Sequence, residues 1–86
     1  MGKWHIYIVR CADGSLYTGI ATDLGARIAK HNSGTGAKYT RSHRPVSLVW
    51  TEAMRSESAA RRKEAAIKKM DKTEKETFIK GPRHEI

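Results

Sequence analysis

Residues 4–20 read WHIYIVRCADGSLYTGI, and this stretch decides the fold. Its first eight residues are rich in β-branched and aromatic types, which is typical of a strand. The pair Asp13-Gly14 is a turn signal, and residues 15–20 form a second apolar run that returns along the first. The sequence therefore predicts a β-hairpin at the start of the chain.

The length of the hairpin loop determines which side chains share a face of the sheet. A two-residue turn would pair Tyr7 with Ile20 and send Tyr7 and Tyr17 to opposite faces, because side chains alternate along a strand. A three-residue loop that ends at Gly14 pairs Tyr7 with Gly19 and puts both tyrosines on one face. A left-handed glycine in such a loop is common. We predict the three-residue loop, and the site inferred below depends on it.

The middle of the chain predicts a helix followed by a loop. Asp23 can cap a helix that runs to about Asn32, and Leu24 and Ile28 share one face of it. Residues 33–45 contain two glycines and four basic or histidine residues, so we expect them to form a loop.

The rest of the chain predicts a third strand and two more helices. Residues 46–53 have the strand composition, and Ser56 can cap the next helix. A break at residues 71–73 precedes a short last helix that ends at Gly81. The expected order is ββαβαα in the α/β (α+β) class, with a three-stranded, mainly antiparallel sheet flanked by helices.

Length and charge limit the function. The 86 residues are enough for one domain, residues 1–86, with its core in residues 4–70 and a C-terminal helix and tail in residues 71–86. Seventeen Lys and Arg against nine Asp and Glu give a net charge of +8, which attracts polyanions. Nucleic acid is the expected partner. The alternative is a basic protein whose lysines only aid solubility, and no segment has the pattern of a membrane-surface helix.

Cysteine content and hydropathy bear on the compartment. The single cysteine, Cys11, rules out an intrachain disulfide and a Cys-rich zinc cluster, and we expect it to be a small buried side chain. No apolar run approaches the roughly 20 residues that span a membrane, and no signal peptide precedes the first strand. These features predict a cytoplasmic protein without a membrane partner.

Two degenerate triplets in the hairpin and the residues after them resemble a known family. His5-Ile6-Tyr7 stands where the triplet GIY falls, and Tyr17-Thr18-Gly19 stands where YIG falls. The further residues that carry the resemblance are Arg27, His31-Asn32-Ser33-Gly34, Gly36 to Thr40, Arg44-Pro45 and Glu64. In this spacing, over residues 4–70, the chain resembles the GIY-YIG nuclease superfamily. It is most similar to the small single-domain bacterial members, which resemble structure-specific nuclease subunits.

The resemblance implies a metal-dependent endonuclease that hydrolyses phosphodiester bonds in DNA with a single Mg²⁺ or Mn²⁺. By this resemblance, Glu64 ligates the cation and Arg27 pairs with the phosphate. Tyr7 or Tyr17 positions or deprotonates the attacking water, and we favour Tyr17. His31 assists proton transfer or holds a phosphate oxygen.

Helical spacing gives an independent view of three of these residues. Arg27 and His31 are four apart and project side by side, at the edge of the apolar stripe, so we expect them at the rim of the core. Glu64 lies at the border of its own helix's apolar stripe and is the only acid from Ser58 to Met70. A lone carboxylate among basic residues suits one hard divalent cation.

Each residue also has a structural interpretation. Glu64 could be a surface carboxylate paired with Arg61 or Lys68, and Arg27 an exposed helix arginine. Both tyrosines could simply pack against the sheet. His31 could be a polar cap at the end of its helix.

A basic segment follows the first helix and contains an aromatic residue. Such a mixture suits a groove that tracks a nucleic-acid backbone and stacks a base, although a solvated loop is the alternative. The residues expected to bind nucleic acid are Lys38, Tyr39, Thr40, Arg41 and Arg44.

The chain departs from the family pattern at two points, and two other functions stay open. His5 replaces the first glycine of GIY, and no asparagine follows Glu64. The other functions are a non-catalytic nucleic-acid-binding module and an interaction domain of a repair complex, active only when a protein partner supplies substrate affinity. Branched, flapped or single-stranded DNA is the expected substrate, because the small chain offers little surface for reading base sequence.

Overall fold

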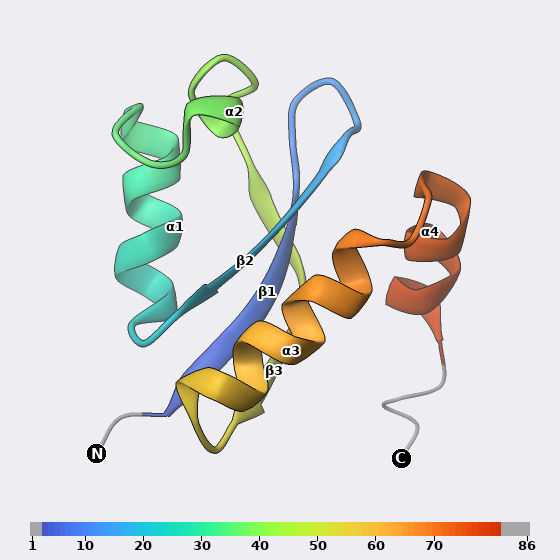
Figure 1. Ribbon diagram of the computed structural model, residues 1–86. Helices are drawn as coiled ribbons and strands as arrows, with labels where there is room; N and C mark the ends of the chain where they lie inside the picture. The colour runs from blue at the N-terminus through green and yellow to red at the C-terminus, as the bar shows by residue number, and fades with distance from the viewer. Residues whose placement is uncertain (1–2, 82–86) are drawn as a thin grey trace.

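The computed structural model describes residues 3–81 and has the expected layered architecture (Figure 1). The strands form one antiparallel sheet in the order β2-β1-β3. The order ββαβαα is confirmed for the longer elements, and one short helix, α2, is added between α1 and β3. The elements are β1 (Trp4–Arg10), β2 (Leu16–Ala21), α1 (Leu24–Ser33), α2 (Lys38–Arg41), β3 (Ser47–Met54), α3 (Glu57–Lys68) and α4 (Lys72–Lys80).

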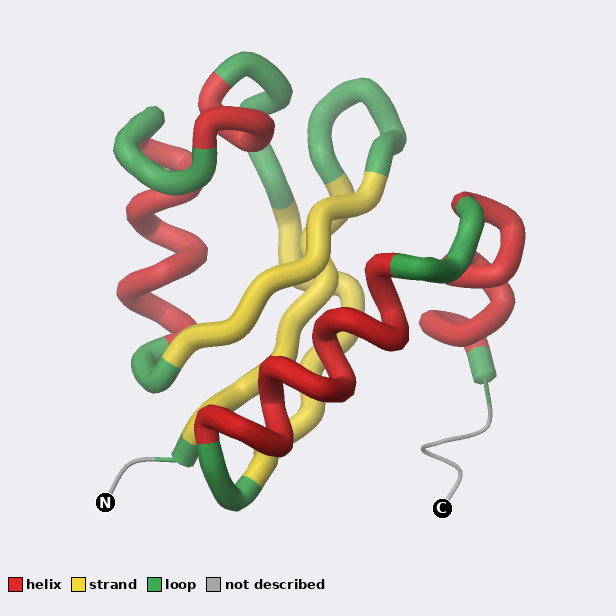
Figure 2. Tube along the Cα trace, viewed as in Figure 1, coloured by secondary structure: helices red, strands yellow, loops and turns green. Residues whose placement is uncertain are grey.

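The hairpin of β1 and β2 turns through three residues, as predicted (Figure 2). Tyr7 is paired with Gly19, and Val9 with Tyr17. Gly14 has a φ of 89°, the left-handed conformation that closes such a loop without a side-chain clash. Both tyrosines therefore lie on the same face of the sheet.

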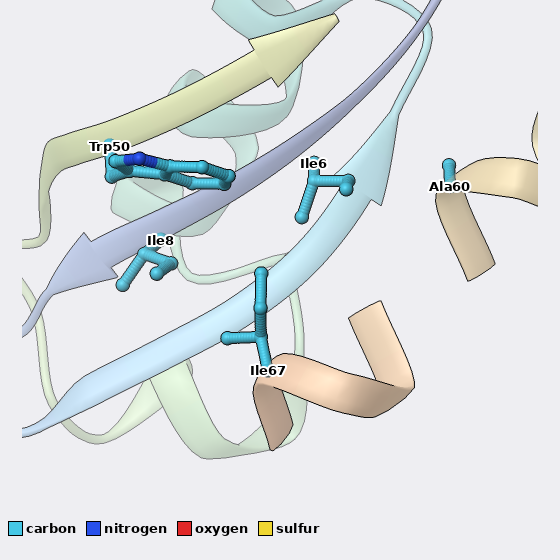
Figure 3. Close-up of a cluster of buried hydrophobic side chains, with 5 residues drawn as sticks. All are labelled: Ile6, Ile8, Trp50, Ala60 and Ile67. Carbon is cyan, nitrogen blue, oxygen red and sulfur yellow. The ribbon is translucent and has the colours of Figure 1, made fainter. Parts of the chain in front are cut away.

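One face of the sheet carries most of the apolar core, under α3. Figure 3 shows Ile6 and Ile8 of β1 and Trp50 of β3 opposite Ala60 and Ile67 of α3. All five are buried, and Trp50 also contacts the ring of Phe78 in α4, with centroids 4.8 Å apart.

The opposite face carries a second cluster, under α1. Tyr7 and Val9 of β1 and Cys11, the residue after it, are buried there, and Leu24 and Ile28 of α1 pack against them. Cys11 is buried, as expected, and burial raises the pKa of its thiol. Two buried polar residues of the candidate site, His31 and Thr40, are connected by hydrogen bonds to Tyr7 of this second cluster.

Helix starts follow the predicted caps. The carboxylate of Asp23 accepts a hydrogen bond from the amide of Ala26, the hydroxyl of Ser56 caps α3 in the same way, and Asp71 forms a capping box with Glu74. No helix within residues 3–81 has the length and apolar character needed to cross a membrane.

Residues 33–45 contain a helical turn where a loop was expected. Residues 38–41 form α2, in which the amide of Arg41 donates to the carbonyl of Ala37. The turn forms because Thr40 is fully buried beneath it. The local sequence does not predict this tertiary contact. This turn helps to build the candidate site.

A network of charges fastens α4 to the hairpin loop. The guanidinium of Arg10 makes a two-bond contact with the carboxylate of Glu76, at 2.7 and 2.8 Å, and Lys72 contacts the same carboxylate at 2.8 Å. Both cations also donate to the carbonyl of Gly14. The hydrogen bonds from Arg10 and Lys72 lower the pKa of Glu76 to about 2. We call Arg10, Gly14, Lys72 and Glu76 together the α4 clasp.

Candidate active site

A chain of buried hydrogen bonds connects β1, α1 and α2 on the second face of the sheet. The hydroxyl of Tyr7 lies 2.8 Å from Nε2 of His31, and Nδ1 of His31 lies 2.7 Å from the hydroxyl of Thr40. That hydroxyl donates its own proton to the carbonyl of Ala37, at 3.0 Å. Thr40 therefore accepts from Nδ1–H of His31, and the free Nε2 accepts the proton of Tyr7.

Burial keeps both ends of the Tyr7–His31 contact neutral. The two residues have no exposed surface. Burial, and next to it the charge of Arg27, lowers the pKa of His31, while burial raises the pKa of Tyr7 against the opposing effect of Arg27. The resting pair is therefore a neutral imidazole that accepts a hydrogen bond from a neutral phenol.

His31 lies deeper than its place on the helix suggested. We expected it at the rim of the core or as a helix cap, and both expectations are wrong, because its ring bonds to Tyr7 and Thr40 and is completely buried. Gly36 permits this depth. A Cβ at Gly36 would lie 2.6 Å from Nδ1 of His31, so any larger residue would displace the imidazole.

Tyr17 is the tyrosine with access to solvent. It is half-buried on β2, a strand at the edge of the sheet, whereas Tyr7 lies on the central strand. Its ring meets His31 edge-on, with centroids 5.4 Å apart, and stacks on Tyr39 at 6.1 Å. His31 thus contacts both tyrosines, one by a hydrogen bond and the other by its ring.

Arg27 lies one helical turn before His31, beside the hydroxyl of Tyr7. It is half-buried, and its Nε is buried without a hydrogen-bond partner among residues 3–81. The side chain also borders an open hollow of about 300 Å³, together with Trp4, Asp23 and Lys30. A half-buried guanidinium at the edge of a hollow is suited to an anionic ligand.

Glu64 supplies the carboxylate of the site from α3. Its side chain is only 17% exposed, and its charge contributes to the raised pKa of Tyr7, so it lies near that residue. Of the two ion-pair partners considered for it, Lys68 is the actual one, at 3.2 Å, whereas Arg61 pairs with Glu57.

The donor set can be tested against the expected cation. Within residues 3–81, no three His, Cys, Asp or Glu side chains gather closely enough to hold a metal on their own. A cation here would depend on Glu64 together with water and substrate oxygens. Mg²⁺ is often held in this way, by one or two carboxylates with its remaining positions filled by water and phosphate, so the residues fit the group.

The family described as the GIY-YIG catalytic domain matches residues 3–77. The chain belongs to this family. The match covers both tyrosine triplets and extends through α1, α2 and α3 into α4. It places the chain in a superfamily of nucleases, which bind nucleic acid.

Small proteins of the same family are similar over most of their length. A UPF0213 protein of Desulfotalea psychrophila is 54% identical over 91% of this chain and 72% of its own length. One from Staphylococcus haemolyticus is 51% identical, over 92% of this chain and 96% of its own.

Two solution structures share the fold. The UPF0213 protein of Bacillus halodurans is 45% identical, covers 91% of this chain and 83% of its own, and has a TM-score of 0.60. A protein of E. faecalis is 41% identical, over 93% and 85%, with a TM-score of 0.65.

The basic segment of this GIY-YIG domain divides into exposed and buried residues. Lys38, Tyr39 and Arg41 are exposed and remain candidates for nucleic-acid contact. Thr40 does not fit that role, because it is fully buried and holds His31. Arg44 is exposed but bonds to the carbonyl of Arg41, at 3.0 Å, and so braces α2.

Three residues of the family motif make contacts in the site that the sequence did not predict. Thr40 fixes the tautomer of His31, and Gly36 leaves room for the ring. Asn32 bonds to both the amide and the carbonyl of Val46 and so fastens the end of α1 to the start of β3. An asparagine at a helix end is a weak signal for such a bridge, and the motif that contains Gly36 and Thr40 did not indicate their contacts with His31.

Proposed function

We propose that this protein is a metal-dependent endonuclease that hydrolyses phosphodiester bonds in DNA with one divalent cation. The contact of His31 with both tyrosines carries the proposal. It brings a neutral imidazole from α1 against residues of β1 and β2, beside the cation-binding candidate and a half-buried arginine. Membership of a nuclease family supports the same reaction class.

Exposure and hydrogen bonding suggest different roles for the two tyrosines. Tyr17 has solvent access, so it is the residue that positions the attacking water. Tyr7 is fully buried and donates to His31, so it holds the imidazole in place. The oxygen of the water bonds to phosphorus while the bond from phosphorus to the leaving ester oxygen breaks. The water releases a proton to solvent beside Tyr17, and the leaving oxygen takes up a proton from solvent. Arg27 offsets the charge that develops on the phosphoryl oxygens.

Glu64 would hold the cation, Mg²⁺ or Mn²⁺. When bound, the cation supplies Lewis-acid chemistry, which polarises the phosphoryl oxygen and stabilises the leaving oxygen. The carboxylate is suited to this task because it is 17% exposed and has one cationic partner, Lys68. A largely shielded carboxylate binds a cation more strongly than one in open water.

Cleavage of labelled branched and single-stranded DNA tests the proposal. We expect cleavage in Mg²⁺ or Mn²⁺ and none in EDTA. Arg27→Ala should lower kcat by about 10²–10³, as loss of one transition-state donor does, and Glu64→Ala should lower it at least as much. Glu57→Ala is the matched control, because Glu57 is an acid on the same helix in an (i, i+4) pair with Arg61. Equal activity of all four proteins would refute the proposed site.

A non-catalytic binding module is the second candidate. It is favoured by the exposed Lys38 and Arg41 beside the stacked rings of Tyr39 and His43, whose centroids are 4.3 Å apart. Salt-sensitive binding of DNA without cleavage, unchanged by Glu64→Ala, is the result that would select this function. A partner-dependent enzyme would instead cleave only after the partner is added.

A further inference from the structure

Lys68 contacts two residues of the candidate site at once. Its ammonium lies 3.2 Å from Oε2 of Glu64 and 6.0 Å from the centroid of the Tyr17 ring. Lys68 is 52% exposed, whereas Glu64 is 17% exposed. A half-exposed ammonium therefore covers the shielded carboxylate that the proposed function assigns to a metal.

An ammonium and a divalent cation compete for the same carboxylate oxygens. The pair is an (i, i+4) pair on the last turns of α3, and such pairs are weak when one partner is exposed. The lysine side chain is also flexible, with four carbons and a strongly hydrated head. Binding of a divalent cation to Glu64 would therefore displace Lys68 rather than be blocked by it.

A hollow beside Tyr17 can accommodate the displaced side chain of Lys68. Lys68 borders this second hollow, which has a volume of about 380 Å³ and shares no lining residue with the hollow at Arg27. No acidic residue lines this hollow. Its lining residues are Leu16, Tyr17, Thr18, Tyr39, Lys68 and Lys75. Two ammonium groups next to two aromatic rings favour a phosphate group of a bound strand.

We propose that Lys68 is a displaceable gate on the metal ligand. In the metal-free protein it neutralises Glu64, and when a cation binds it turns into the hollow beside Tyr17 and Tyr39 to bind a phosphate next to the scissile one. This proposal rests on the proposed function, because it takes Glu64 as the metal ligand. Its consequence is that metal binding and substrate binding strengthen each other through one side chain.

Binding of Mn²⁺ without nucleic acid tests the first half of the proposal. Mn²⁺ broadens the NMR signals of nearby amides, so a titration followed at Ala60 and Ile67 reports occupation at Glu64. We expect Lys68→Met to lower the midpoint concentration about two- to fivefold, the range of a weak ion pair. Lys63→Met is the matched control, because it removes the same charge from the same helix but from a pair with Glu52.

Binding of an oligothymidylate tests the second half. The dependence of its affinity on salt should be the same for wild type and Lys68→Met in EDTA, where Glu64 holds the lysine. In Ca²⁺ the wild-type slope should be steeper by about 0.7, the contribution of one phosphate contact to a single strand. Equal slopes in Ca²⁺ would overturn this half.

The outcomes separate the gate from the function on which it rests. If Lys68→Met and wild type bind Mn²⁺ equally, Lys68 is no gate. The same holds if Lys63→Met tightens Mn²⁺ binding as much as Lys68→Met does. Glu64→Gln should abolish the broadening. If Mn²⁺ broadens neither amide in wild type nor in Lys68→Met, the cation site itself is wrong, and the proposed function fails with it.

Discussion

Replacing Gly19 with alanine should destabilise the protein through the buried phenol of Tyr7. A Cβ at Gly19 would lie 2.5 Å from the Tyr7 hydroxyl oxygen and 2.7 Å from the ring carbon that bears it. Contacts this short cannot persist, and Tyr7 is fully buried, so its ring has no open space to enter. The ring must shift, and the 2.8 Å bond to His31 must lengthen or break.

The size of the effect follows from two costs. Overpacking a filled core costs about 1–3 kcal/mol. A buried imidazole left without its partner costs about 1–3 kcal/mol more. We therefore expect Gly19→Ala to lower the free energy of unfolding by about 2–6 kcal/mol, a large part of the roughly 5–15 kcal/mol typical of a folded domain.

Urea unfolding followed by circular dichroism measures this change, and a second glycine provides the control. Gly25 lies in α1 and would meet only the Asp23 carboxylate, 3.8 Å away. Gly25→Ala should therefore stabilise the protein, by about 0.4–1 kcal/mol. A loss below about 1 kcal/mol for Gly19→Ala would refute the reasoning, because it lies below the lower limit of the two costs together.

Two further predictions concern proton binding. Because the folded-state pKa of Glu76 is lowered to about 2, the α4 clasp stabilises the fold above the ordinary pKa of 4.5, and this contribution is lost as the pH falls toward 2. Thermal unfolding of Glu76→Gln should be less dependent on pH over that range, and an unchanged dependence would contradict the clasp. For His31, ¹⁵N NMR should show a neutral ring protonated at Nδ1 at pH 6.5, because burial lowers its pKa below that value. A ring protonated at Nε2, or an imidazolium, would overturn the hydrogen-bond assignment.

The fold was predictable where the signal is local. The alternation of side chains and the Asp13-Gly14 pair determine the hairpin register, and Asp23 and Ser56 cap helices within their own first turn. These features depend on residues a few positions apart. The GIY-YIG family was recognisable for the same reason, since its marks are short motifs in a fixed order.

Other features arise only when distant segments meet. Tyr7 and His31 are 24 positions apart, and Arg10 and Glu76 are 66 positions apart. The burial of His31 depends on α2, which in turn depends on Thr40 packing beneath it. Neither residue has a local partner that would reveal this arrangement, so the sequence predicted a helix-edge histidine and a loop threonine.

The hydrogen-bonded chain through Tyr7, His31 and Thr40 has a consequence for the evolution of such proteins. These side chains hold two helices to the sheet, so a lineage that ceased to cut nucleic acid would still retain them in order to fold. Glu64 pairs only with Lys68 of its own helix, and Arg27 leaves its Nε without a partner among residues 3–81, so both are less constrained by the fold once the reaction is abandoned. Among descendants of this chain, loss of these two residues is therefore the earliest mark of an abandoned activity.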